Sequence, residues 1–415
     1  MIDFDVIICG GGLVGLTLAN ALGSSNLSVA LIDGQSCPPL PGPALQKAEA
    51  PSLNQYQLQS GYAPRVSAIN VASKNILENL GVWQNVNRIC AFDKMSVRDT
   101  SGSAQIEFSA SDIKLESLGY VVENRQILAA LADNLSRFTN VSCFWDTGLK
   151  EIVDNRLESG IEVLEENPRA YLLYAEDKGM ACDLLVGADG GNSRVRELAD
   201  IKTLRWSYDQ EAIVTTIQTE LPHGNIARQW FTPEGPLAFL PLADPHYCSI
   251  VWSLNDVSQH KNASPEEFCA SLSDASEGEL GKVVGADERL SFPLAQQHAF
   301  RYVKDNLALI GDAAHTIHPL AGQGANLGFA DASALASELK QAKFSESGIG
   351  DLLLLRRYEK SRRAHNLLMT SVMEALKRLY TSGDPGVNWL RNTVMKVAND
   401  NDMLKSMMTR LASGL

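Results

Sequence analysis

The feature that most constrains the fold is a strand–turn–helix–strand pattern in the first 33 residues. Residues 4–9 (FDVIIC) and 28–32 (SVALI) are short apolar, β-branched runs, as expected of buried parallel strands. Between them lies the loop GGGLVG, in which Gly10 permits a tight turn, Gly12 lets a pyrophosphate approach and Gly15 lets helix and strand pack closely. Asp33 follows the second run, where an acid binds a ribose 2′-hydroxyl. The pattern predicts a unit that binds an ADP-containing dinucleotide.

A second motif, GDAAHTIHPLAGQG, occupies residues 311–324. An apolar run at 307–310 predicts a strand that ends at Asp312, whose carboxylate can accept hydrogen bonds from sugar-alcohol hydroxyls. A turn with Pro319 follows, and Gly322 and Gly324 open a helical stretch at 325–339. Free backbone N–H groups around Gly324 to Asn326 can hold partial negative charge with help from the helix dipole.

A third motif lies in the middle of the chain. Residues 183–186 (DLLV) predict another strand, which leads into the segment GADG at 187–190 and then to Ser193 and Arg196. The alternative for Asp189 is an acid in an ordinary turn at a strand end.

In order and approximate spacing, the three motifs resemble those of the aromatic-hydroxylase group of flavoprotein monooxygenases, which share the para-hydroxybenzoate hydroxylase fold. Finer matches resemble the ubiquinone-biosynthesis hydroxylases within that group. They are PRVSAI at 64–69, LGVW at 80–83, LGYVVENR at 118–125, GPLAFLPL at 235–242, PLAGQG at 319–324 and NLG at 326–328. The resemblance spans most of the chain.

The resemblance implies FAD as the cofactor and O2 as the co-substrate. It implies hydroxylation of the aromatic ring of a polyprenylated phenol in ubiquinone biosynthesis, through a flavin C4a-hydroperoxide. Asp189 would then lie near the FAD pyrophosphate, and Arg65 and Arg125 would contact the FAD phosphates or the adenosine side, a surface salt bridge being the alternative for each arginine. The full set of expected FAD-binding residues is Gly10, Gly12, Val14, Gly15, Asp33, Arg65, Arg125, Asp189, Asp312, Gly322, Gly324 and Asn326.

No catalytic residue is assigned, because the cofactor carries the difficult step and the reaction needs no protein nucleophile. His315 and Pro319 of the second motif are weak candidates. His318 also lies in this motif, and a turn-stabilising hydrogen bond is the favoured role for either histidine. A second GxGxxG unit is absent from the sequence. NAD(P)H or another electron donor is therefore expected to bind transiently.

The predicted fold class is α/β, with a Rossmann-like FAD-binding domain interleaved with an α+β substrate domain that carries an antiparallel sheet, plus C-terminal helices. We assign 1–73, 122–202 and 298–345 to the FAD-binding domain, 74–121 and 203–297 to the substrate domain, and 346–415 to the helical region. Strands are expected at 212–218, 227–231, 237–240 and 249–252. Trp230, Phe231, Phe239 and Trp252 either line an aromatic pocket above the flavin or pack in the core, which is the favoured reading for each one.

Charge and composition narrow the partners. The net charge of −13 argues against a nucleic-acid partner. The seven cysteines are scattered without a CxxC, so we expect reduced packing residues and no metal site. With no signal peptide or spanning run expected, the predicted location is cytoplasmic, with peripheral contact at the inner face of the membrane left open.

The segment 389–411 is the expected point of contact with the membrane or with a partner. Its apolar residues recur at near-helical spacing and include four methionines, a pattern typical of an amphipathic helix. Such a helix contacts a membrane or other ubiquinone-biosynthesis proteins, or packs on the body of the protein or in a homo-oligomer interface; packing is favoured.

Other functions remain open at this stage. They are a flavin monooxygenase acting on another small aromatic, a non-catalytic flavoprotein in a biosynthetic assembly, and an NAD-dependent dehydrogenase that uses the N-terminal unit alone. The dehydrogenase leaves Asp189 and Asp312 unexplained.

Overall fold

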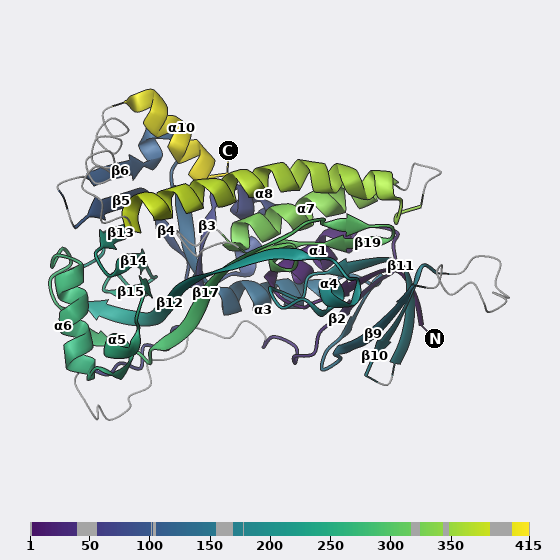
Figure 1. The fold of residues 1–415 in the computed structure, drawn as a ribbon, viewed down its shortest axis with the longest axis horizontal. Helices are drawn as coiled ribbons and strands as arrows, with labels where there is room; N and C mark the ends of the chain where they lie inside the picture. The colour runs from purple at the N-terminus through teal and green to yellow at the C-terminus, as the bar shows by residue number, and fades with distance from the viewer. Residues whose placement is uncertain are drawn as a thin grey trace.

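The computed structural model describes residues 2–39, 56–100, 102, 105–154, 169–176, 178–316, 324–342, 348–381 and 401–414. Two large sheets and a small third one make up its β-structure, and helices cover them (Figure 1).

The first sheet is built on the predicted parallel strands, in the order β18-β19-β11-β1-β2-β8. Strands β1, β2, β8, β11 and β19 run parallel, and β18 pairs antiparallel with β19. The added antiparallel strands β9 and β10 extend from β11. The bounds are β1 Ile2–Cys9, β2 Val29–Ile32, β8 Val141–Phe144, β9 Leu149–Asp154, β10 Tyr171–Ala175, β11 Lys178–Gly187, β18 Val303–Lys304 and β19 Leu307–Leu309.

Helices pack on this sheet because its central strands are apolar on both faces. Ile7, Ile8 and Leu31 are completely buried, in one core with α1, α3, α7 and the start of α8. The helices concerned are α1 Leu13–Leu22, α3 Asn124–Leu135, α4 Arg194–Leu198, α7 Gly324–Ala342 and α8 Leu352–Thr381. In Figure 1, α8 runs along α7 and continues toward the second sheet.

The second sheet has the order β20-β17-β12-β15-β14-β13-β5-β6, with β16 beside β12. It is antiparallel except where β13 runs parallel to β5. The bounds are β5 Lys94–Asp99, β6 Gln105–Ser109, β12 Thr203–Thr219, β13 Ile226–Thr232, β14 Gly235–Pro241, β15 Tyr247–Leu254, β16 Val283–Ala286, β17 Leu290–Ala299 and β20 His315–Thr316. The four strands predicted for this region are confirmed, and each is longer than its apolar run.

One face of the second sheet packs on α6 (Pro265–Ala275), next to the short α5 (Ser258–Asn262). Trp230, Phe239 and Trp252 lie in that core with Phe268 of α6, each about 1% exposed or less. The Trp230 and Phe239 rings meet edge to face, with centroids 4.9 Å apart. The alternative that these aromatic residues line a pocket is therefore wrong, and Phe231 belongs to a separate buried cluster with Val97 and Ile106. Alternation along the strands turns all three large rings toward α6.

A small sheet connects the two large ones. It consists of β3 (Val66–Asn70), β7 (Gly119–Glu123) and β4 (Cys90–Phe92). Strand β3 leads into α2 (Val71–Asn79), and β7 leads into α3. Two single-turn helices, η1 (Trp83–Asn85) and η2 (Ala110–Ile113), lie in the same region. Leu77, Val82 and Trp83 pack in the core of the parallel sheet, while β5 and β6 join the antiparallel sheet. The chain thus crosses between the two cores several times, and the interleaved fold class is confirmed.

Candidate cofactor site

The three sequence motifs meet at one edge of the parallel sheet. The glycine-rich loop follows β1, the GADG segment follows β11, and η3 (Gly311–Ala313) follows β19. Backbone hydrogen bonds join these strand ends: Ala188 N donates to Cys9 O at 2.7 Å, Ile310 N to Gly187 O at 3.0 Å and Gly10 N to Ile32 O at 2.8 Å. In open α/β sheets a ligand binds outside the carboxyl ends of such strands. The topology therefore creates a candidate site from segments 300 residues apart in the sequence.

In the glycine loop, Gly10 and Gly15 are crowded by backbone atoms, whereas Gly12 is open. A Cβ at Gly10 would lie 2.4 Å from the carbonyl oxygen of Ala188, and Gly10 has a positive φ of 114°. A Cβ at Gly15 would lie 1.8 Å from the carbonyl oxygen of Gly10. At Gly12 a Cβ would meet nothing within 4 Å. The loop is thus packed tightly against its own sheet and open on the side where a phosphate would approach.

Val14 packs behind this loop. A Cβ on Gly311 or on Gly328 would lie 3.0 Å or 2.4 Å, respectively, from a methyl group of Val14. The side chain therefore joins α1 to η3 and α7 at the point where the first and second motifs touch.

Asp33 lies half-buried beside the glycine loop. Its carboxylate accepts hydrogen bonds from Gly11 N at 2.5 Å and from Gln35 N at 2.7 Å. The Trp145 indole, at the end of β8, lies against Gly11 on the same side; an added Cβ on Gly11 would meet its ring at 2.5 Å. Trp145 was not singled out from the sequence because a lone aromatic after a short strand carries no motif.

The Asp189 carboxylate faces the start of α4. It accepts hydrogen bonds from Arg194 N at 2.7 Å, from Val195 N at 3.0 Å and from the Ser193 hydroxyl at 2.5 Å. The side chain thus caps that helix, while its backbone nitrogen lies close to Gly10. Arg196 joins this loop to the second motif, because it donates to Gly191 O at 2.7 Å and to Ala313 O at 2.8 Å. The sequence indicated no role for this arginine beyond its place in the third motif.

Asp312 is exposed to solvent, yet other residues lie close to its carboxyl group. Packing around its carboxyl raises the pKa of Asp312, while the positive charges of His315 and Arg65 act in the opposite direction. Arg65 is exposed and close enough to influence this carboxyl. The two residues therefore lie in the same part of the candidate site, although no direct hydrogen bond joins them in the described part of the chain.

Arg125 lies elsewhere in the network around the site. It donates to Gly61 O at 2.6 Å and pairs with Glu123 at 3.0 Å. Glu123 is 1% exposed, also pairs with Arg88, and accepts from Ala63 N at 2.6 Å. This buried carboxylate fastens residues 61–63 to β7, ahead of Arg65. Arg125 is thus part of a structural anchor, and whether it also contacts the cofactor stays a prediction.

At the second motif, His315 is buried and its Nε2 atom lies 2.5 Å from Oδ2 of Asp331 in α7, the kind of bond that the turn-stabilising interpretation requires. Gly324 begins α7, and a Cβ on it would meet open space. Asn326 is buried and clamps β3 by accepting from Asn70 N at 3.0 Å and donating to Ala68 O at 2.8 Å. Pro319 and Gly322 lie outside the described residues.

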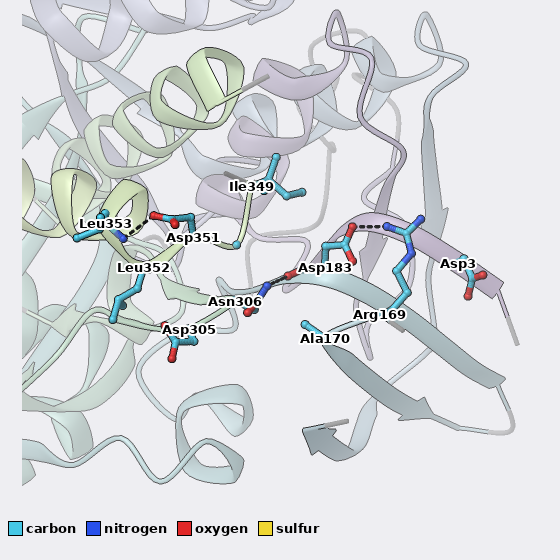
Figure 2. A pocket seen from close by; sticks show the side chains of 12 residues that line it. Asp3, Arg169, Ala170, Asp183, Asp305, Asn306, Ile349, Asp351, Leu352 and Leu353 are labelled. Atoms are coloured by element: carbon cyan, nitrogen blue, oxygen red, sulfur yellow. Dashed lines mark hydrogen bonds and ion pairs between the residues drawn. The ribbon is translucent and has the colours of Figure 1, made fainter. Parts of the chain in front are cut away.

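A pocket of about 930 Å³ lies at the opposite end of the parallel strands (Figure 2). Asp3, Asp183 and Asp305 line it, and Asn306 Nδ2 donates to Asp183 O at 2.7 Å. Asp3 is near the start of β1 and Asp305 precedes β19, so the pocket is away from the strand ends that carry the three motifs. It is not the predicted cofactor site.

Comparison with solved structures identifies the class of fold. PqsL of Pseudomonas aeruginosa, crystallised with 2-aminobenzoylacetate, aligns over 95% of this chain and 100% of its own, with a TM-score of 0.74 and 21% identity. The p-nitrophenol 4-monooxygenase PnpA of Pseudomonas putida DLL-E4 aligns over 99% and 97%, with a TM-score of 0.74 and 16% identity. The fold is that of the FAD-dependent monooxygenases, as the sequence predicted.

Sequence comparison specifies the family. The model described as "FAD binding domain" matches residues 53–371. The ubiquinone biosynthesis monooxygenase COQ6, mitochondrial, of Danio rerio is 34% identical, covering 99% of this chain and 90% of that protein. The 3-demethoxyubiquinol 3-hydroxylase of Escherichia coli (strain K12) is 33% identical, covering 99% and 98%. The chain belongs to the family of FAD-dependent ubiquinone-biosynthesis monooxygenases, so its cofactor is FAD and its co-substrate is O2.

Proposed function

We propose that this enzyme hydroxylates the aromatic ring of a polyprenylated phenol, using electrons from NAD(P)H that binds transiently. The observation that carries the proposal is the convergence of the glycine loop, Asp33 and Asp312 at one sheet edge, in a chain whose full-length relatives are named for ubiquinone biosynthesis. The absence of a second GxGxxG unit from the sequence supports a transient donor.

The residues at the strand ends fit FAD. Gly12 leaves room for the pyrophosphate, and the first N–H groups of α1 point toward that space. Asp33 lies where the adenosine ribose would be held, and Asp312 where the ribityl hydroxyls would be held. Asp189 fixes the GADG segment to the start of α4, beside the glycine loop. Arg65 supplies positive charge near Asp312.

Bound FAD, once reduced, supplies the activation of O2 for transfer of one oxygen atom to an electron-rich ring. The chain's own part is to bind, orient and shield. The N-terminus of α7, at Gly324 to Asn326, offers N–H groups and the positive end of a helix dipole to partial negative charge on the flavin ring. Asn326 fixes this terminus to β3 through its two hydrogen bonds. We assign no proton transfer to His315, since it is buried against Asp331.

Purified enzyme supplied with NADPH or NADH tests the function. We expect a phenol with a prenyl chain to stimulate oxidation of the donor and to gain one oxygen atom, detected by mass spectrometry. A matched phenol without the chain should be a poor substrate. Equal turnover of both phenols would contradict the prenylated substrate, and absence of hydroxylation with either donor would contradict the donor. The quinone intermediates that accumulate in a strain lacking the protein would name the ring position.

The assignment of the two acids gives a prediction about cofactor affinity. Asp33→Ala and Asp312→Ala should each weaken FAD binding by about 1.5–3 kcal/mol, roughly ten- to a hundred-fold, because each removes a charged hydrogen-bond partner. Titration of apoprotein with FAD measures the effect. Glu338→Gln, which removes a partly exposed acid paired with Arg357, is the control and should bind FAD normally. Full flavin occupancy of both variants after extensive dialysis would contradict the assignment.

We further propose that the C-terminal segment contacts the lipid surface in which a polyprenylated phenol resides. Within the described ranges, no helix combines the length and apolar character that a membrane crossing requires. Residues 382–400 lie outside the described part, whereas α10 (Asp402–Ala412) is described. It packs on η2 and β6. Met408 joins the cluster of Val97 and Ile106, and Lys405 Nζ lies 3.6 Å from Asp112 Oδ2.

The outer face of α10 carries two exposed methionines in its first half. Met403 is 85% exposed and Met407 63% exposed, one helical turn apart, and Arg410 is exposed one turn further on. Part of the segment therefore packs on the body of the protein, as predicted, and the exposed part is the surface that we propose for the membrane.

Substituting Met403→Gln and Met407→Gln together should reduce binding to anionic phospholipid vesicles several-fold while FAD content and thermal stability stay unchanged, because both side chains point away from the core. Co-sedimentation with the vesicles measures it. Leu353→Gln is the matched control and should bind like the wild type. Leu353 lies at the N-terminal end of α8 and is 67% exposed. Undiminished sedimentation of the double variant would contradict the proposed surface.

A further inference from the structure

Asp331 is a completely buried carboxylate in the interior of α7. Four hydrogen bonds converge on it. Oδ2 accepts from Gly311 N at 3.1 Å and from His315 Nε2 at 2.5 Å. Oδ1 accepts from Arg362 Nε at 2.7 Å and from Asn366 Nδ2 at 3.2 Å. The side chain therefore has no spare acceptor capacity directed at a ligand.

The group stays ionised. Burial alone would raise the pKa of Asp331, but His315 and Arg362 outweigh it and bring the pKa to about 2. Arg362 is only 12% exposed, so its charge is shielded from solvent together with that of the acid. Removing one member of a buried charged pair leaves the other uncompensated, which makes the arrangement sensitive to substitution.

The four partners come from two different parts of the molecule. Gly311 and His315 belong to the second motif, whereas Arg362 and Asn366 lie one turn apart on α8. The same helix also holds the chain before the motif. Tyr358 donates to Leu309 O, at the end of β19, at 2.8 Å, and Glu359 accepts from Tyr302 N, just before β18, at 2.7 Å. One face of α8 thus supports β19 and the turn that follows it.

Asp312 lies between the two anchored residues of this turn. Gly311 precedes it, His315 follows three residues later, and both are bonded to the same oxygen of Asp331. The direction in which the Asp312 carboxylate points is consequently set by the position of Asp331, and through it by α8.

We propose that Asp331 is a positioning residue of the FAD site, which transmits the placement of α8 to the turn that carries Asp312. The proposal rests on the FAD-binding role proposed above for Asp312. It assigns to the C-terminal helix a direct influence on cofactor affinity, exerted by residues outside the strand-end loops.

The full-length apoprotein of Asp331→Asn tests this. The variant keeps the shape of the side chain and removes the charge that Arg362 and His315 share. We expect FAD to bind about ten-fold more weakly and the visible circular dichroism of the bound flavin to change. Glu338→Gln is the matched control, since Glu338 also joins α7 to α8 by pairing with Arg357, but on the surface. It should change the FAD dissociation constant by less than about two-fold.

A double variant separates positioning from general destabilisation. If Asp331 acts through Asp312, then Asp331→Asn combined with Asp312→Ala should bind FAD no more than about two-fold more weakly than Asp312→Ala alone. Fully additive losses would overturn the proposal, as would a lowered melting temperature with an unchanged FAD dissociation constant. If Asp331→Asn does not fold, Asn366→Ala takes its place, with an expected loss of about three-fold. It removes the longest of the four bonds to Asp331, together with the bond that Arg362 Nη2 donates to Asn366 Oδ1 at 3.1 Å.

The outcomes also separate the FAD-binding role of Asp312 from the positioning role of Asp331. An Asp312→Ala variant that binds FAD normally would overturn the cofactor assignment and the positioning role together. A weakened Asp312→Ala beside a normal Asp331→Asn would overturn the positioning role alone.

Discussion

Gly15→Ala is expected to lower the free energy of unfolding by about 3 kcal/mol or more, because the added Cβ would lie 1.8 Å from the carbonyl oxygen of Gly10. The obstacle is backbone of the first motif, which α1 cannot avoid without moving away from β1. Denaturant unfolding of the apoprotein measures the loss. FAD binding should fall as well, since the same loop carries the phosphate-facing N–H groups.

Gly12→Ala provides the contrast within the same loop. Its Cβ would meet nothing within 4 Å, and Gly12 has an ordinary φ of −75°. We expect apoprotein stability to change by less than about 0.5 kcal/mol while FAD affinity falls, because the methyl group would occupy the space left for the pyrophosphate. If Gly12→Ala bound FAD normally, the pyrophosphate would have to lie elsewhere. If Gly15→Ala were as stable as the wild type, the tight packing of the loop would be wrong.

The second large effect expected concerns acid sensitivity and His298. This histidine is 7% exposed and lies beside His315 across the β17–β20 pair, with its ring 5.4 Å from that of Tyr302. Neither of its ring nitrogens has a hydrogen-bond partner among the described residues. Burial, followed by the charges of His315 and of Arg363 on α8, lowers the pKa of His298 from 6.5 to about 4.

The direction of the effect follows from linkage. Because the ring is harder to protonate in the folded protein, the unfolded chain takes up its proton first as the pH falls below 6.5. Folding stability is therefore lost between pH 6.5 and about 4, by about 3 kcal/mol in all.

His298→Leu should remove this component, so that its stability falls less than that of the wild type between about pH 7 and about pH 4.5. Leucine also leaves no unpaired polar atom in the site. Denaturant unfolding of both proteins at the two pH values gives the comparison. Parallel losses in the two proteins would show that His298 is not buried as a neutral ring.

The arrangement of the strand-end motifs could be predicted because each carries its own local chemistry. A buried apolar run followed by glycines and an acid indicates a strand that ends in a ligand-binding turn. Three such motifs can meet at the same end of one sheet only if their strands are parallel neighbours. The contacts of Gly10, Gly15 and Val14 follow from that arrangement. Long-range pairing then places Asp312 beside the N-terminal loop.

The network behind the site could not be predicted, because its members resemble ordinary helix residues. Asp331 occurs in an alternating stretch of α7, and Arg362 is one of several cations in a polar part of α8. Only the packing of α8 on α7 shows that these two residues share a buried ion pair. The same holds for Glu123, whose burial depends on a loop more than 50 residues earlier in the chain.

The aromatic residues of the second sheet show the limit of pattern alone. A strand that alternates large rings with small residues predicts one apolar face, but the sequence does not show which face meets α6. Trp230, Phe239 and Trp252 turned out to lie on the α6 side.

The register of the parallel sheet has a consequence for how this enzyme is made. Strand β1 pairs along nearly its whole length with β11, so Ile2 lies opposite Met180, and β11 in turn pairs with β19 near residue 307. On a ribosome, the first strand must therefore wait until about three-quarters of the polypeptide has been synthesised before its sheet is complete. During that interval FAD has no finished site to enter. Nascent chains should accordingly expose apolar strands for most of translation, and acquire flavin only after β19 has been synthesised.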